Sequence, residues 1–266
     1  MAMSEREVAK EQRTVVVLGT ARSGTSMTGG MLDILGVDLG STAYPTGSTP
    51  TGAFEDEDFG RLHKEILNSS AQGKTYFDPP IPEQILAQRD RFAQRIENLI
   101  LEKSRGKSFW GWKHPPTILT IELYLPYLVN PHFIVVFRNP LGIARSTVEH
   151  TSRHKDNLDI FRALKLVNFY YGEIFRFIEC HPELPKIFIS FEEIIDNPVR
   201  EAGRLAEFLG IELTDEKITN IDKLVIPRER IATEKQKAEA LWTGKIPRLI
   251  HKKLVPLLRA RKKVDR

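Results

Sequence analysis

The stretch Val15-Val16-Val17-Leu18-Gly19-Thr20-Ala21-Arg22-Ser23-Gly24-Thr25-Ser26-Met27 decides the fold. It opens with a short β-branched apolar run, typical of a parallel strand that is buried on both faces. Gly19 and Gly24 allow the chain to turn tightly after this strand, and a helical pattern begins at Thr25. The N–H groups of the loop and the positive end of the helix then converge on one point. The stretch therefore predicts an anion-binding site.

The loop differs from that of the nucleotide triphosphatases at one decisive position. Gly19 and Gly24 have the spacing of the G-x-x-x-x-G-K-[ST] pattern, but Thr25 stands where that pattern has lysine. A cation, Arg22, lies three residues before Thr25 instead. We therefore expect a phosphate cradle of another type. Its candidate ligands are Arg22, Ser23, Gly24, Thr25 and Ser26.

Composition limits the class of protein. The 266 residues are enough for one large α/β core. The single cysteine, Cys180, excludes an internal disulfide and suits a reducing compartment. We see neither a signal peptide nor a run of about 20 apolar residues, so we expect a cytoplasmic protein with no transmembrane segment. The expected organisation is a frayed start over 1–13, an α/β domain over 14–245 and a basic segment over 246–266, packed on the domain or extending from it.

Strands and helices alternate along the chain. Apolar runs over 109–112, 132–137 and 186–190 predict further buried strands. Amphipathic patterns predict helices over residues 25–35, 55–68, 82–103, 118–128, 140–151, 157–180 and 198–209. This alternation implies a parallel sheet with right-handed crossovers. The predicted fold class is α/β, a single P-loop-like domain with a central parallel sheet flanked by helices.

Polar residues follow two of the other predicted strands. Lys113-His114 comes after the tryptophan-rich strand, and Arg138 closes the next one, with Ser146 in the helix behind it. Ligands of open parallel sheets bind beyond the carboxyl ends of the strands. These groups should therefore lie near the loop over residues 19–25, which we call the phosphate loop. A magnesium-dependent enzyme usually has an aspartate at such a strand end. Arg138 in that place indicates a site that neutralises anions with side-chain cations rather than a metal.

Two motifs together resemble the sulfotransferases that use 3′-phosphoadenosine 5′-phosphosulfate (PAPS). They are Ala21-Arg22-Ser23-Gly24-Thr25-Ser26, and Arg138-Asn139-Pro140 with Ser146 eight residues after Arg138. In that family the first motif binds the 5′-phosphosulfate and the second binds the 3′-phosphate. The resemblance therefore implies the sulfotransferase fold and PAPS as cosubstrate, with 3′,5′-ADP as product and no metal required.

Two further stretches agree with this resemblance. Gly111-Trp112-Lys113-His114-Pro115 is similar to the W-x-K-x-P segment of the bacterial, Golgi-type and tyrosylprotein branches. Ser190-Phe191-Glu192-Glu193-Ile194-Ile195-Asp196-Asn197-Pro198, with the Leu205–Gly210 stretch after it, is similar to a strand, acid and helix segment of the family. The similarity covers about residues 14 to 210.

The resemblance implies in-line attack of an acceptor hydroxyl on the sulfuryl group. Arg22 and Lys113 match catalytic cations of the tyrosylprotein type and would stabilise the charge on the leaving oxygens. Glu55 is a candidate general base, and His114 and His63 are its rivals. Acids in a first helical turn also suit the helix dipole, and a lysine at a strand end also suits solvent. The roles of Glu55 and Lys113 stay open between these alternatives.

The remaining candidates lie toward the C-terminus. The resemblance implies nucleotide contacts for Lys245 and Arg153. His150 and His154 are four residues apart, but no further ligand is evident, so we predict no metal site. Residues 245–266 hold nine Lys and Arg against one acid, a charge that suits a solvated helix end or a polyanion.

The acceptor is not identified by the sequence. Residues 38–51, the turn over 76–82 and the segment after 151 are expected to shape its pocket. The acceptor hydroxyl is that of a small molecule, a carbohydrate, a lipid or a peptide, and no nucleic-acid partner is expected. The oligomeric state is open. Two alternatives remain, a P-loop kinase that uses ATP and a non-enzymatic protein that binds nucleotides or polyanions.

Overall fold

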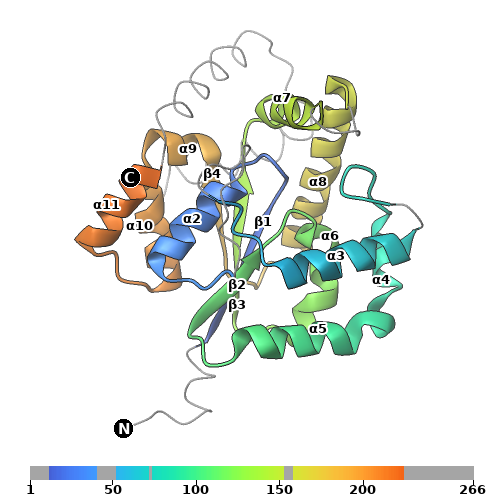
Figure 1. The fold of residues 1–266 in the computed structure, drawn as a ribbon, viewed down its shortest axis with the longest axis horizontal. Coiled ribbons are helices and arrows are strands. Elements are labelled where there is room, and N and C mark those ends of the chain that lie inside the picture. The colour runs from blue at the N-terminus through green and yellow to red at the C-terminus, as the bar shows by residue number, and fades with distance from the viewer. Residues whose placement is uncertain (1–11, 41–51, 72–73, 153–157, 225–266) are drawn as a thin grey trace.

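A computed structural model describes residues 12–40, 52–71, 74–152 and 158–224 (Figure 1). These residues form a four-stranded sheet in the order β2-β1-β3-β4. β1 (Arg13–Gly19) pairs in parallel with β2 (Phe109–Lys113) on one side and β3 (Pro131–Phe137) on the other, and β3 pairs in parallel with β4 (Lys186–Ser190). The predicted α/β class with a central parallel sheet is confirmed.

Helices cover both faces of the sheet, as Figure 1 shows. Successive residues of β1 point to opposite faces. Val15 and Val17 pack in one core cluster, with α2 (Thr25–Leu35), α9 (Phe191–Asp196), α10 (Pro198–Leu209) and α11 (Asp215–Leu224). Val16 and Leu18 pack in the other, with α3 (Glu57–Ser70), α4 (Pro82–Leu86), α5 (Arg89–Ser104), α6 (Thr117–Tyr124), α7 (Pro140–Thr151) and α8 (Ile160–Cys180). The sheet is therefore apolar on both sides, which explains the unbroken apolar run in β1.

Several predicted helix ends agree with the structure. Gly36 ends α2 in the left-handed conformation, with φ 96°. Asn139 caps α7 and Asn197 caps α10, each through its side-chain oxygen. The helix expected from residue 157 begins at Ile160 instead, because the Asp159 side chain caps it.

Three expectations are corrected, and two helices are present that were not expected. The helix expected over 82–103 is two helices, α4 and α5, because the chain leaves helical geometry at Gln88, where ψ is 1°. The helix expected to reach residue 128 ends at Tyr124 and continues as the 3₁₀ turn η1 (Leu125–Tyr127). α9 and α11 are not predicted by the sequence patterns. Residue 13 is not frayed, because its N–H donates to the carbonyl of Ser108 as β1 begins.

Both edges of the sheet receive hydrogen bonds from neighbouring segments. Asp38, which follows α2, bridges to the outer side of β2: its N–H donates to the Phe109 carbonyl, and its carbonyl accepts from Gly111. On the β4 side, Arg204 Nη1 donates to the Phe188 carbonyl at 3.2 Å. Among the described helices, none has the length and apolar character needed to span a bilayer.

Candidate active site

The three polar clusters predicted from the sequence meet at one edge of the sheet. In the parallel register, Val17 of β1 lies opposite Lys113 of β2, and Gly19 of β1 lies opposite Val136 of β3. The segments that leave these three strands therefore emerge side by side. This is the carboxyl edge, where open α/β sheets bind ligands.

The phosphate loop presents the amino end of α2. Gly24 is the N-cap residue in the left-handed conformation, with φ 102°, and no side chain caps the helix. The N–H groups of the first helical turn are therefore available to an anion. Arg22 also has a positive φ, of 68°, a conformation that costs energy for a residue with a side chain.

One predicted ligand of the loop has a different position from the expected one. Ser23 is buried, and its hydroxyl donates to the carbonyl of Thr20 at 2.7 Å. The Ser23 N–H donates to the same carbonyl at 3.2 Å. The Ser23 side chain therefore stabilises the loop from within rather than reaching a ligand.

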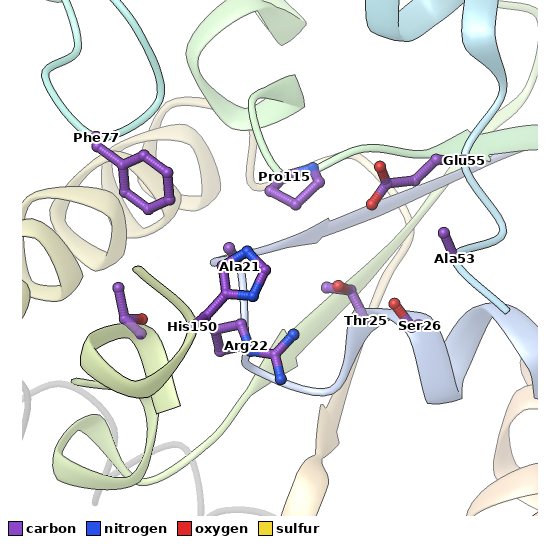
Figure 2. A pocket seen from close by; sticks show the side chains of 10 residues that line it. Ala21, Arg22, Thr25, Ser26, Ala53, Glu55, Phe77, Pro115 and His150 are labelled. Atoms are coloured by element: carbon purple, nitrogen blue, oxygen red, sulfur yellow. The ribbon is translucent and has the colours of Figure 1, made fainter. Parts of the chain in front are cut away.

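A cavity of about 290 Å³ lies beside the loop (Figure 2). It is lined by Ala21, Arg22, Thr25, Ser26, Ala53, Glu55, Phe77, Pro115, Thr147 and His150. Figure 2 shows Arg22, Thr25 and Ser26 on one side of it and Glu55 near Pro115 on another. Four of the predicted site residues therefore share one cavity, and Phe77 brings the expected turn over 76–82 into its wall.

Lys113 forms a close ion pair with Glu55. The ammonium Nζ is 2.6 Å from Glu55 Oε1, and it also donates to Ser26 Oγ at 3.3 Å. The Lys113 side chain is 1% exposed, whereas that of Glu55 is 34% exposed. Burial lowers the pKa of the Lys113 amine, Glu55 opposes this shift, and the charge of Arg22 adds to it. Lys113 is therefore not a solvated strand-end lysine, and it places a cation next to the cavity.

Glu55 is held outside the helix that follows it. The neighbouring Asp56 is the N-cap of α3 and accepts hydrogen bonds from the N–H groups of Asp58 and Phe59. Glu55 therefore does not occupy the first turn of α3, so the helix dipole does not account for its place. Its carboxylate is directed to Lys113 instead.

Phe54 anchors the segment that carries Glu55. It adopts a left-handed conformation, with φ 52°, and is buried against α2. Its side chain fills the space that Gly29 leaves, since a Cβ built on Gly29 would lie 2.9 Å from Phe54 Cβ. A Cβ built on Gly30 would lie 3.0 Å from Leu224 Cδ1 and 3.3 Å from Phe54 Cε2. The two glycines of α2 thus allow the close approach that places Glu55.

The two histidine candidates form a pair in which His63 is fully buried and the His114 side chain is 19% exposed. His63 Nδ1 and His114 Nδ1 are 2.9 Å apart, and their rings stack with centroids 5.0 Å apart. Burial lowers the pKa of His114 to about 4, Glu55 opposes this shift, and Lys113 adds to it. Burial also lowers the pKa of His63, which has no exposed surface. Neither ring lines the cavity, so Glu55 is the candidate base that an acceptor can reach.

Arg138 and Ser146 lie directly behind the phosphate loop. Arg138 Nη1 donates to the carbonyl of Arg22 at 3.0 Å, and Arg22 Nε donates to Ser146 Oγ at 3.0 Å. The structure thus brings together both predicted anion motifs, although they are more than a hundred residues apart in sequence. Two guanidinium groups and a hydroxyl gathered at a helix amino end are suited to a ligand with several negative charges.

Tyr76 is a contributor that no sequence motif indicated. Its hydroxyl accepts a hydrogen bond from the N–H of Ala21 at 2.6 Å, and its ring stacks on Tyr170 with centroids 4.4 Å apart. Tyr170 in turn donates to the Tyr76 carbonyl at 2.7 Å. These contacts dock the turn on the phosphate loop, so Phe77 reaches the cavity. These contacts join segments that are distant in the sequence, and hydrophobic periodicity predicts only local structure, so it could not predict them.

Some candidates cannot be placed. Lys245, Arg153 and His154 lie outside the described residues, as do residues 41–51 of the expected acceptor loop. His150 lines the cavity. Within the described ranges, no three His, Cys, Asp or Glu side chains gather in a way that could hold a metal ion.

Comparisons with known proteins agree with this arrangement. Residues 14–215 match the model of the sulfotransferase family. No curated protein sequence matches the chain. Among solved structures, the sulfotransferase STF9 from Mycobacterium avium is similar at 17% identity and a TM-score of 0.50, over 82% of this chain and 69% of that one. A sulfotransferase from Alicyclobacillus acidocaldarius is similar at 15% identity and a TM-score of 0.50, over 85% of this chain and 95% of that one.

The two structures share the fold with this chain, and the family model covers most of the described residues, including β1, β2, β3 and the phosphate loop. The family's general reaction is sulfuryl transfer. The chain belongs to the sulfotransferase family.

Proposed function

We propose that this protein transfers the sulfuryl group of PAPS to a hydroxyl acceptor. The observation that carries the proposal is the joining of Arg22, Arg138 and Ser146 at the amino end of α2, beside the cavity that holds Glu55. PAPS carries a 5′-phosphosulfate and a 3′-phosphate, so it needs two neighbouring anion sites. The contact between Arg138 and the Arg22 carbonyl brings two such sites together.

The donor fits the residues that line this edge. The first-turn N–H groups of α2, with Arg22, Thr25 and Ser26, would hold the 5′-phosphosulfate. Arg138 and Ser146 would hold the 3′-phosphate. When bound, PAPS supplies an activated sulfuryl group whose leaving group is 3′,5′-ADP. The cations that neutralise the charges are side chains of the chain itself, so we expect binding without a metal.

Glu55 acts as general base in this proposal. As the acceptor oxygen forms its bond to sulfur, the hydroxyl proton passes to the Glu55 carboxylate, and the bond between sulfur and the 5′-phosphate oxygen breaks. Lys113 and Arg22 stabilise the negative charge that develops on the leaving oxygens. Lys113 also holds the Glu55 carboxylate in place, because its ammonium donates to Glu55 Oε1 at 2.6 Å.

The cavity does not select one acceptor class. Ala21, Ala53, Phe77 and Pro115 give it an apolar wall, and Thr147 and His150 add polar groups. Small molecules, carbohydrates, lipids and peptides with a free hydroxyl all remain candidate acceptors. Incubation of an extract of the native host with radiolabelled PAPS, followed by identification of the labelled product, would identify the acceptor.

Calorimetry with two nucleotides tests the donor. The proposal predicts that 3′,5′-ADP binds without magnesium at least tenfold more tightly than ATP with magnesium. It also predicts that Arg138→Ala and Ser146→Ala each weaken 3′,5′-ADP binding, whereas Arg145→Ala, at an exposed arginine of the same helix, does not. Tighter binding of ATP with magnesium would favour a kinase. Salt-sensitive binding of polyanions that survives Arg22→Ala would favour a non-enzymatic role.

A further inference from the structure

Two aromatic residues surround Arg138, and neither belongs to the motifs that indicate the donor site. On the basis of the function proposed above, we infer that Tyr171 and Phe191 are positioning residues that orient Arg138 toward the 3′-phosphate. Tyr171 acts on the backbone of Arg138, and Phe191 acts on its guanidinium.

Tyr171 fixes the backbone at the point where β3 has ended. Its hydroxyl accepts from the Arg138 N–H at 2.9 Å and donates to the Arg138 carbonyl at 2.8 Å. The backbone N–H and carbonyl of Arg138 are thus both hydrogen-bonded to one side chain from α8. Burial raises the pKa of the Tyr171 hydroxyl, so the donor proton is retained across the physiological range. The contact sets the direction in which the Arg138 side chain leaves the sheet.

Phe191 lies between Arg138 and the phosphate loop. The Arg138 Cζ is 4.1 Å from the centroid of its ring, a close cation–π contact. The ring also lies against Gly24: a Cβ built there would lie 2.6 Å from Phe191 Cδ2. One ring therefore contacts both the N-cap of α2 and the guanidinium.

Two further contacts orient the guanidinium of Arg138. The Phe191 ring stacks on the guanidinium, and the Arg22 carbonyl accepts from Nη1 at 3.0 Å. One contact lies on the face of the guanidinium and the other at its Nη1, so together they hold its plane. Such an arrangement prepares a cation for a phosphate, because less side-chain freedom is lost when the anion binds.

The experiment compares two nucleotides that differ only at the 3′ position. Calorimetry measures the binding of 3′,5′-ADP and of 5′-AMP to the full-length wild type, Tyr171→Phe and Phe191→Leu. We expect each variant to bind 3′,5′-ADP about 5- to 20-fold more weakly, the range expected from loss of a partly desolvated cation–π contact or of hydrogen bonds. Binding of 5′-AMP to Tyr171→Phe should stay within about twofold, because that change disturbs only the contact with the 3′-phosphate. Phe191→Leu also changes a contact with Gly24, so for this variant 3′,5′-ADP should lose more affinity than 5′-AMP.

Two additional variants show whether the effect passes through Arg138. Phe191→Tyr keeps an aromatic ring under the guanidinium and should bind 3′,5′-ADP like the wild type. Phe191→Leu combined with Arg138→Ala should bind no more weakly than Arg138→Ala alone, because both changes remove the same interaction. Phe177→Leu, at a buried aromatic residue of α8 that packs on Phe133, controls for loss of a core ring.

Different results would overturn different statements. Equal weakening of 3′,5′-ADP and 5′-AMP, or no weakening of either, would contradict the positioning role. If the wild type does not prefer 3′,5′-ADP over 5′-AMP, and Arg138→Ala has no effect, the proposed donor itself is wrong. Should Phe191→Leu fail to fold, Tyr171→Phe still decides the question, because it removes a single oxygen.

Discussion

Lys113 and Glu55 form the residue contact on which the proposed chemistry depends most directly. The ammonium is almost completely buried, and the carboxylate, which lines the cavity, is its ion-pair partner at 2.6 Å. A buried ammonium without a counter-charge is unfavourable, and Glu55 opposes the lowering of the Lys113 pKa that burial causes. The same contact orients the Glu55 carboxylate at the edge of the cavity.

Glu55→Gln is expected to lower turnover about 10²- to 10⁴-fold, because glutamine cannot accept the acceptor proton. Affinity for 3′,5′-ADP should change little, since the nucleotide groups are held by other residues. Initial rates with radiolabelled PAPS and the acceptor found in host extract measure the first effect, and calorimetry measures the second.

Glu57→Gln is a matched control, because Glu57 is an exposed carboxylate two residues further along, in the first turn of α3. It should leave turnover unchanged. If Glu55→Gln and Glu57→Gln have the same turnover as the wild type, Glu55 is not the base.

Single residues also show which parts of the candidate site could be predicted from the sequence. The sequence motifs singled out Arg22, Glu55 and Lys113, and the structure places them together: Arg22 and Glu55 line one cavity, and Lys113 contacts Glu55. The contact of the Ser23 hydroxyl with the nearby Thr20 carbonyl could not be predicted, because only the loop conformation reveals it. Tyr76 gave no signal, because its partners Ala21 and Tyr170 are brought to it by tertiary packing.

At the scale of elements, α2 has two functions. Its amino end forms the proposed anion site, and its middle accepts the Phe54 side chain against Gly29 and Gly30. Glycine in a helix interior is unfavourable by about 1 kcal/mol relative to alanine, so these residues lower the intrinsic stability of the helix. In return, the absence of a Cβ at these positions lets Phe54 approach α2 closely, and this approach sets the position of Glu55.

Gly29→Ala is therefore expected to lower turnover about 10- to 100-fold, although alanine is the better helix former. The new Cβ would be 2.9 Å from Phe54 Cβ, and relief of that contact moves the segment that carries Glu55. Initial rates and urea unfolding, measured side by side, separate activity from stability.

Gly172→Ala in α8 is the matched control, because nothing lies within 4 Å of a Cβ built there. It should keep full turnover and gain up to about 1 kcal/mol of stability. Equal activity of the two alanine variants would show that the Phe54 contact does not position Glu55.

Elements were predicted well where periodicity or capping decided them and poorly elsewhere. Apolar runs predict the strands. Gly36 predicts the end of α2, and the Asn139-Pro140 pair predicts the start of α7. The break at Gln88 has neither glycine nor proline to mark it, since it arises as α4 packs against α3 and α6. α9 is short and follows β4 directly, so its helical period is too brief to detect.

At the scale of the whole molecule, the His63–His114 pair lowers the stability of the folded chain in acid. The ordinary pKa of histidine is 6.5, and that of His114 in the folded chain is about 4. Between these values the unfolded chain binds more protons than the folded chain. The free energy of unfolding therefore falls as the pH is lowered from 6.5 toward 4.

Between pH 7 and pH 4.5, His114 alone is expected to account for a loss of about 2 kcal/mol. Urea unfolding of the wild type and of His114→Gln at both pH values checks this, because glutamine has no proton to gain. The difference between the two pH values should be smaller in the variant by about that amount, whatever the variant's stability at pH 7. An equal difference in both proteins would contradict the role of His114.

The hydrogen bonds at the two edges of the sheet bear on self-association. An exposed edge strand offers unpaired N–H and C=O groups to another copy and promotes aggregation or strand exchange. Here the Asp38 backbone forms hydrogen bonds with the outer side of β2, and the Arg204 side chain donates a hydrogen bond to the Phe188 carbonyl of β4. A second copy that extended the sheet at β2 or β4 would have to displace these intramolecular bonds. If the protein forms a dimer, side-chain packing of helices is therefore the more favourable route than edge-to-edge pairing of strands.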